Sequence, residues 1–120
     1  MLRNHTISFK NAIRGLVWAL KTQPNYKIHL SLSLLAIVGG FCFNISYFEF
    51  LIILILIFVG LAIETVNTAI EETNDAIDVK VRPDIGLAKD IAAGTMLIFA
   101  IGAFTIACII FIPKIWLYIY

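Results

Sequence analysis

The chain has 120 residues, of which 61% are hydrophobic and only 14% charged, and its net charge is +1. Its mean hydropathy is +0.95. Soluble domains are about half apolar and about a quarter charged, so this chain has too few polar residues to cover a globular surface. The composition therefore excludes an ordinary soluble domain and predicts a membrane protein.

The N-terminal region predicts an amphipathic helix over residues 4–22 that lies in the membrane interface. Its apolar face follows helical spacing and comprises Phe9, Ile13, Leu16, Val17 and Leu20. Pro24 ends this helix, because proline disfavours a helical conformation of the residue before it. Residues 1–27 contain five basic residues and no acidic one. Such a segment suits the anionic cytoplasmic leaflet, and no nucleic-acid-binding motif accompanies it, so we expect no nucleic-acid partner.

Three apolar stretches follow, and we expect them to be transmembrane helices at residues 28–46, 48–70 and 91–112. A span requires about 20 residues to cross the hydrocarbon layer. The turn-like sequence Asn44-Ile45-Ser46 closes the first span, and the third is expected to stop near Pro113. The expected fold class is therefore an all-α membrane protein, with a surface helix and three spans in one domain of residues 1–120.

Basic residues indicate the orientation of the chain, because they are enriched on the cytoplasmic side of membranes. Besides the N-terminal region, the segment 71–90 contains Lys80, Arg82 and Lys89. The link after the first span has no basic residue, and the C-terminal tail has Lys114. We therefore expect a multi-pass protein of the cytoplasmic (inner) membrane, with the N-terminus and segment 71–90 inside and the C-terminus outside.

Polar side chains form one stripe along the second expected span. Glu64 lies at membrane depth, where a carboxylate costs about 3 kcal/mol even on permissive insertion scales. At about 100° per residue, Asn67, Glu71 and Asp75 fall on the same face of the helix as Glu64. The stripe therefore leads from membrane depth to the cytoplasmic surface.

This stripe is suited to a site for a cation or a proton. Carboxylates one or two turns apart can hold Mg²⁺ together with substrate phosphates, and a half-buried glutamate can act as a base. Lys89 and Asp90 open the third span, and a lysine there can hold a polyphosphate as a point charge. The residues alone leave three classes open: an enzyme acting on phosphorylated ligands, an ion or proton transporter, and a structural subunit whose Glu64 and Asn67 hydrogen-bond within the helix bundle.

Two motifs resemble the prokaryotic diacylglycerol kinase and undecaprenol kinase family. They comprise Glu64-Thr65-Val66-Asn67-Thr68-Ala69-Ile70-Glu71 with Asp75, and Ala88-Lys89-Asp90-Ile91-Ala92-Ala93-Gly94. The stretch Asn25-Tyr26-Lys27-Ile28-His29 resembles the entry of that family into its first span, Asn-Phe-Arg-Ile-His. The resemblance covers nearly the whole chain, including the spacing of 14 residues from Asp75 to Lys89.

The resemblance implies a homotrimer of three-span subunits that share their active sites. Each would transfer the γ-phosphate of ATP to a membrane lipid alcohol with the help of Mg²⁺. By position, the resemblance implies that Glu64 is the general base and that Asn67 orients the lipid hydroxyl. It also implies that Glu71 binds Mg²⁺. The nucleotide site implied in this way comprises Glu71, Asp75, Lys89 and Asp90.

The chain departs from the family's pattern at two places. Gln23 stands where many relatives have a second metal-binding glutamate, and an amide oxygen coordinates a metal without adding charge. In the loop between the last two spans, relatives often have Glu-Tyr-His where this chain has Lys80, Val81 and Arg82, and we expect Lys80 and Arg82 to contact phosphates instead. The stretch 25–29 is closer to relatives that favour undecaprenol, so we expect undecaprenol rather than diacylglycerol as the acceptor.

Overall fold

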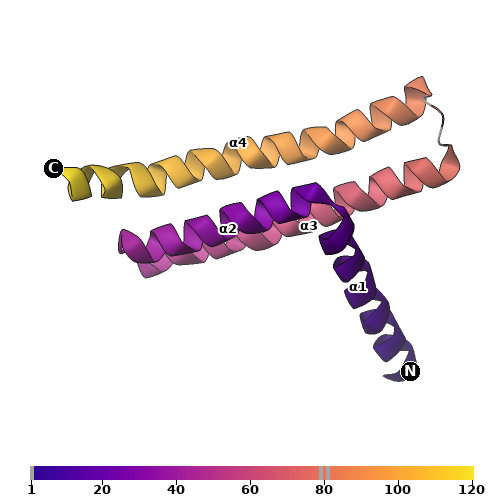
Figure 1. Cartoon of the computed structure of the whole chain (residues 1–120), viewed down its shortest axis with the longest axis horizontal. Coiled ribbons are helices and arrows are strands. Elements are labelled where there is room, and N and C mark those ends of the chain that lie inside the picture. The colour runs from indigo at the N-terminus through magenta and orange to yellow at the C-terminus, as the bar shows by residue number, and fades with distance from the viewer. Residues whose placement is uncertain (1, 79, 81) are drawn as a thin grey trace.

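A computed structural model describes residues 2–78, 80 and 82–120 of the chain. The described residues form four helices and no strand, which confirms the all-α prediction. The helices are α1 (Leu2–Thr22), α2 (Pro24–Cys42), α3 (Tyr47–Ile77) and α4 (Pro83–Ile119). As Figure 1 shows, α2, α3 and α4 lie alongside one another, whereas α1 projects away from them. The molecule measures 56 × 43 × 22 Å along its principal axes.

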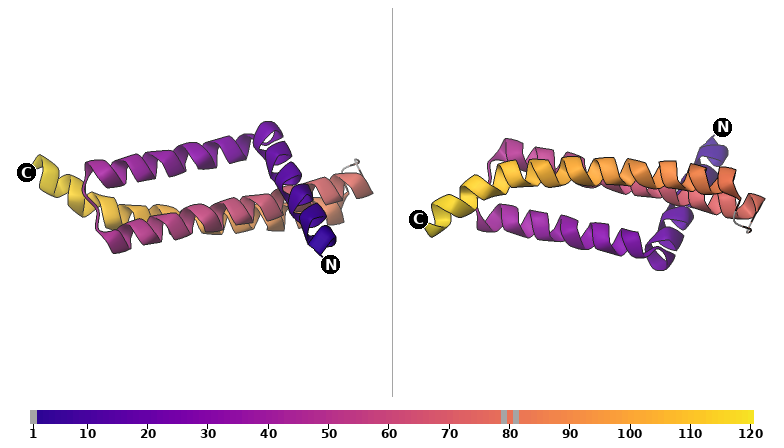
Figure 2. Two further views of the ribbon diagram at one scale, coloured as in Figure 1. Left: turned by 90° about the horizontal axis from the view of Figure 1, so that it is seen from below. Right: turned by 90° about the horizontal axis from the view of Figure 1, so that it is seen from above.

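A tight turn joins α2 to α3. Asn44 has a φ of 51°, in the left-handed region that asparagine tolerates better than most residues. The hydroxyl of Ser46 then accepts a hydrogen bond from the backbone N–H of Glu49 at 3.2 Å. The Glu49 carboxylate accepts one from the backbone N–H of Ser46 at 2.6 Å. This capping box starts α3, which runs back along α2 (Figure 2).

The last helix differs from the expected third span at both ends. α4 begins at Pro83, whose fixed φ suits the first turn of a helix, so Lys89 and Asp90 lie in its second turn. It also continues through Pro113 to Ile119, so the helix extends beyond the residues expected to cross the membrane, and the end of the span near Pro113 stays a prediction. Proline inside a helix removes an N–H and bends the chain without always ending it, and membrane helices tolerate such bends. Figure 2 shows the C-terminal end of α4 bent away from the line of the helix.

The segment 71–90, which we expected as a cytoplasmic link, is mainly helical. α3 continues to Ile77 and α4 begins at Pro83, so only a short connection separates them. Val79 and Val81 of this segment lie outside the described residues. Because the connection is short, α3 and α4 pack against each other as antiparallel neighbours.

The buried apolar core lies at the end of the bundle away from α1. Ile45, Ile53 and Ile110 are buried there, and Phe50 and Ile106 pack against them. This cluster joins the α2–α3 turn to the C-terminal half of α4. It leaves the opposite end of the bundle, where α1 meets α2 and α3, to the polar residues of the stripe.

The apolar surfaces of α3 and α4 are largely exposed. In the described part of the chain, α3 and α4 are the two helices long and apolar enough to cross a membrane, and only 17% and 6% of their most apolar windows are buried. A core helix of a soluble protein would be mostly buried, so these faces require lipid or other protein chains around them. The span expected at 28–46 corresponds to α2, which has 19 residues, and its crossing of the membrane stays a prediction.

Candidate functional site

The polar stripe of the sequence lies on α3, which runs without a break through all four positions. Glu64 is 2% exposed and Asn67 is 5% exposed. Glu71 is half-buried, and Asp75 is exposed. The stripe therefore passes from the interior of the helix bundle to its surface, and its two deepest members are a carboxylate and an amide.

The Glu64 carboxylate lies between α3 and the first turns of α2. It interacts with the side-chain amide of Asn25 and lies within electrostatic range of His29, both of which are on α2. Glu71 acts on it from two turns further along α3. Because α2 begins at Pro24, its first two turns supply the two neighbours of Glu64 that come from another helix.

Tyr26 holds the first turn of α2 against α3. This residue is buried, and its hydroxyl is hydrogen-bonded to the hydroxyl of Thr65, the chain neighbour of Glu64. The Thr65 hydroxyl donates its own hydrogen to the Leu61 carbonyl at 2.7 Å. Because a hydroxyl has one hydrogen to donate, Tyr26 is the donor to Thr65. This chain of hydrogen bonds fixes the start of α2 beside Glu64.

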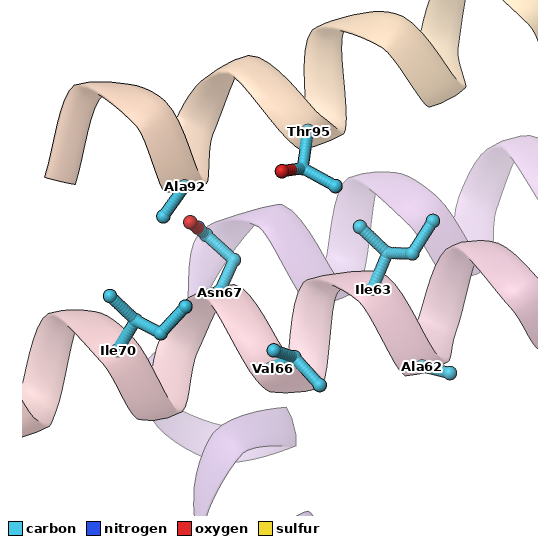
Figure 3. A pocket seen from close by; sticks show the side chains of 7 residues that line it. All are labelled: Ala62, Ile63, Val66, Asn67, Ile70, Ala92 and Thr95. Carbon is cyan, nitrogen blue, oxygen red and sulfur yellow. The ribbon is translucent and has the colours of Figure 1, made fainter. Parts of the chain in front are cut away.

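Asn67 points in another direction, towards α4 (Figure 3). Its Nδ2 donates a hydrogen bond to Oε1 of Glu71 at 3.3 Å, whereas its Oδ1 has no hydrogen-bond partner among the described residues. A buried acceptor without a donor costs about 1–3 kcal/mol. The oxygen is therefore suited to accept a hydrogen bond from a ligand.

A groove of about 220 Å³ lies beside Asn67, between α3 and α4. It is lined by Ala62, Ile63, Val66, Asn67, Ile70, Ala92 and Thr95. The lining is apolar except for Asn67 and Thr95, and the Thr95 hydroxyl is directed to the Ile91 carbonyl of its own helix at 3.5 Å. The groove therefore has an apolar wall with the side chain of Asn67 at its edge.

Lys89 of α4 lies beside the outer end of the stripe. Its ammonium is paired with the Asp75 carboxylate of α3. This hydrogen bond raises the pKa of Lys89, and the nearby carboxylates of Glu71 and Glu72 also favour the ammonium. Asp90 is exposed at the next position. The structure therefore brings two residues of the expected nucleotide site together, with a positive charge at the surface.

Arg82 is paired within its own segment. Its guanidinium donates hydrogen bonds to the two carboxylate oxygens of Asp84 at 2.8 and 3.2 Å. It also lies 4.0 Å from the carboxylate of Asp78. The Arg82 hydrogen bonds lower the pKa of Asp84. Lys80 is exposed, and its backbone N–H donates to Asp78 at 2.9 Å. A phosphate bound by Arg82 would have to replace Asp84.

Glu71 is a suitable ligand for Mg²⁺. Within residues 2–78, 80 and 82–120, no three His, Cys, Asp or Glu side chains are grouped to hold a metal ion. Mg²⁺ often binds one or two carboxylates and completes its coordination with substrate phosphates and water, so a site built on Glu71 fits this ion. Gln23 is the N-cap residue of α2, and its side chain makes no capping hydrogen bond. Its amide oxygen therefore accepts no capping hydrogen bond from the first backbone N–H groups of α2.

Three residues beside Glu64 were not candidates from the sequence, namely Asn25, Tyr26 and His29. A signal for two of them was present, because Asn25, His29 and Ser33 follow each other at intervals of four residues. Polar residues with this spacing share one face of a helix. In an apolar stretch, such a face is expected to contact another helix rather than lipid.

Comparison with known proteins identifies the family. The family model described as prokaryotic diacylglycerol kinase matches residues 10–111. An undecaprenol kinase of Bacillus subtilis (strain 168) is 37% identical over 108 residues, which cover 90% of this chain and 88% of that protein. A diacylglycerol kinase of Synechocystis is 26% identical over 113 residues, which cover 93% of this chain and 65% of that protein. The transporter and the structural subunit are therefore no longer favoured, and the chain, an all-α integral membrane protein, is a lipid kinase that belongs to the prokaryotic diacylglycerol kinase family.

Proposed function

We propose that this lipid kinase transfers the γ-phosphoryl group of ATP to the hydroxyl of undecaprenol at the cytoplasmic face of the membrane. The observation that carries the proposal is the buried Oδ1 of Asn67, which lacks a partner within the described part of the chain and lies beside the apolar groove. An alcohol in this groove would place its apolar chain against α3 and α4 and donate its O–H to Asn67. The hydroxyl would thereby be held one helical turn from Glu64.

The groove favours a polyprenyl alcohol over diacylglycerol. Five of its seven lining residues are apolar. A polyprenyl alcohol has one polar group, its hydroxyl, so its chain requires no hydrogen-bond donors. Diacylglycerol also has two ester carbonyls, and burying them without donors is unfavourable. The similarity to the Bacillus undecaprenol kinase supports the same choice.

Glu64 is the proposed general base. Since the alcohol has one hydrogen, its O–H would turn from Asn67 to Glu64, which takes this proton as the alcohol oxygen attacks the γ-phosphorus, while the bond from that phosphorus to the oxygen retained by ADP breaks. The products are the lipid phosphate, ADP and protonated Glu64, which then returns its proton to solvent. Asn67 orients the hydroxyl. Catalysis of this type depends mainly on positioning and charge.

The nucleotide is proposed to bind at the outer end of the stripe. Glu71 and Gln23 would hold Mg²⁺ there, and the ion would reduce the negative charge of the phosphates. The basic residues proposed to contact the phosphates are Lys89, Lys80 and Arg82. Asp75 holds Lys89 in place, and Asp90 completes the proposed site. Because these residues lie at the surface end of α3 and α4, ATP would reach them from the cytoplasm.

We further propose three spans, formed by α2, α3 and α4, with the N-terminus inside and the C-terminus outside. The distribution of basic residues supports this orientation. The exposed apolar faces of α3 and α4 support contact with lipid or with other chains, and we propose a homotrimer in the cytoplasmic (inner) membrane, in which subunits share their sites. Chemical cross-linking of the protein in membranes, followed by gel analysis, tests the trimer, because a trimer limits the largest cross-linked species to three chains.

An acceptor assay tests the proposed reaction. The purified protein in mixed micelles is given Mg²⁺, ATP and either undecaprenol or diacylglycerol, and the phosphorylated lipid is measured. We expect undecaprenol to be phosphorylated faster. The variant Asn67→Leu should lose most of this activity, whereas the control Asn74→Leu, two turns further along α3, should retain it. Faster phosphorylation of diacylglycerol would refute the acceptor, and full activity of Asn67→Leu would refute the role of its oxygen.

A further inference from the structure

His29 of α2 is fixed against α3 by a hydrogen bond to the main chain. Its Nε2 lies 3.2 Å from the carbonyl oxygen of Ile57. A carbonyl oxygen only accepts hydrogen bonds, so Nε2 bears a hydrogen in this contact. The imidazole is therefore held by one nitrogen, and protonation of the other nitrogen would make it a cation without breaking the contact.

Gly60 of α3 provides the space for this imidazole. A Cβ atom at Gly60 would overlap Cε1 of His29 and would lie 2.6 Å from the ring atoms of Phe99 on α4. The rings of His29 and Phe99 are 6.0 Å apart, with an angle of 42° between their planes. One residue from each of three helices therefore meets at this point, and the imidazole occupies the place of the missing side chain.

This contact lies one helical turn before Glu64 along α3. Gly60 and Glu64 are four residues apart and share one face of α3, and the imidazole lies within electrostatic range of the Glu64 carboxylate. The other groups that act on the carboxylate are the neutral Asn25 and the acidic Glu71, while α4 contributes the apolar Phe99 at this level. Among the described residues that act on Glu64, His29 is thus the one that can become positively charged.

A buried carboxylate needs such a neighbour if it is to act as a base. Glu64 is 2% exposed, and an ionised group in this position is costly unless a partner balances its charge. Glu71 has the same charge and increases the cost. Phosphoryl transfer requires the ionised form of Glu64, because only that form can accept the proton of the lipid hydroxyl.

We infer that His29 is a positioning residue for Glu64: the contact among His29, Gly60 and Phe99 holds the imidazole within electrostatic range of the carboxylate, where a positive charge on the ring balances the charge of the base. The inference rests on the proposed role of Glu64 as the general base. It assigns a function to a histidine that the proposed reaction does not otherwise use.

A double-mutant cycle tests the inference. Turnover and the KM for ATP are measured for purified His29→Gln, Glu64→Gln and the double variant, all in the same lipid micelles. Glutamine at position 29 keeps an N–H for the Ile57 carbonyl but cannot become a cation. We expect His29→Gln to lower kcat by about 10-fold with an unchanged KM for ATP, and to have no further effect in the Glu64→Gln protein, because residues that act as a unit are not additive.

Two further variants separate positioning from packing. His29→Phe keeps an aromatic ring against Gly60 and Phe99 but loses both nitrogens, so it should lower kcat as His29→Gln does while its thermal unfolding stays normal. Ser33→Ala is the control, because Ser33 is buried one turn further along α2 and its hydroxyl is bonded to the His29 carbonyl at 2.8 Å. It should keep normal turnover.

Each outcome has a distinct meaning. Normal kcat for both His29 variants, or equal fold-losses from His29→Gln with and without Glu64, would overturn the role of His29 while leaving the proposed reaction intact. Normal turnover of Glu64→Gln would instead refute the general base, and with it this inference. A loss in the single variant that vanishes in the double variant supports the inference.

Discussion

Lys89 of α4 is paired with Asp75 of α3, although 14 residues separate them along the chain. The pair joins the two helices at the end that α3 and α4 share, next to the link between them. Both side chains are at least one-third exposed, and exposed ion pairs contribute little to stability. The pair therefore contributes little to folding, and the proposed role of Lys89 at the phosphates of ATP has to be tested by its effect on ATP binding.

Replacing Lys89 should weaken ATP binding. We expect Lys89→Met to raise the KM for ATP by roughly 10- to 100-fold, since the variant loses a charge-assisted hydrogen bond to the phosphates. Thermal unfolding should change little. Steady-state kinetics over a range of ATP concentrations measures the effect. Lys114→Met is the control, because Lys114 lies at the other end of α4 and is paired with Glu49 at 3.4 Å. An equal rise in KM for both variants would contradict the assignment.

Glu64→Gln should separate chemistry from binding. If Glu64 is the base, kcat should fall by roughly 10²- to 10⁴-fold, the range typical of a lost general base. ATP binding should be nearly unchanged, because the proposed nucleotide contacts lie at Glu71 and beyond. Turnover and nucleotide affinity are measured on the same purified protein. If Glu64 only makes hydrogen bonds within the bundle, glutamine will keep most of them, and near-normal turnover would remove Glu64 from the mechanism.

The metal dependence should report on Glu71. We expect Glu71→Gln to lose activity and to recover part of it at higher Mg²⁺ concentration, because the variant keeps an oxygen ligand but loses a charge. Activity is titrated with Mg²⁺ at saturating ATP. Glu72→Gln serves as the control on the exposed neighbouring position, and its titration should match that of the unmodified protein.

The same titration tests Gln23. If its side chain is the second ligand of the ion, Gln23→Glu should lower the Mg²⁺ concentration needed for half-maximal activity, because a carboxylate replaces a neutral amide. Unchanged metal curves for both Gln23→Glu and Glu71→Gln would place the metal elsewhere.

The proposed orientation predicts where reporters are found. A reporter fused after Tyr120 should lie outside the cytoplasm, whereas one inserted near Lys80 should lie inside. A pair of reporters active in opposite compartments measures this in cells. If both fusions were found on the same side, the arrangement with three spans could not hold, because α4, which separates the two positions, would not cross the membrane.

Local sequence patterns were sufficient to predict an all-helical chain, but not where the last two helices meet, because most of the link expected at 71–90 is helical. The apolar stretches, the turn at Asn44 and the polar spacing from Glu64 to Asp75 depend on residues close together in the chain, so they can be read without the fold. Pro113 shows the limit of such reading. A proline predicts a helix end when considered locally, but α4 continues through it, since bends within membrane helices are tolerated.

The sequence by itself determined that Glu64 and Asn67 share a polar face of one helix, because helical periodicity depends only on spacing along the chain. Only the tertiary structure decided what each of them contacts. Glu64 lies beside Asn25 and His29 of α2, whereas Asn67 points into the groove against α4. The difference arises because neighbouring helices approach from different sides of α3, and how closely they approach depends on packing between distant residues, such as the space that Gly60 leaves for His29 and Phe99.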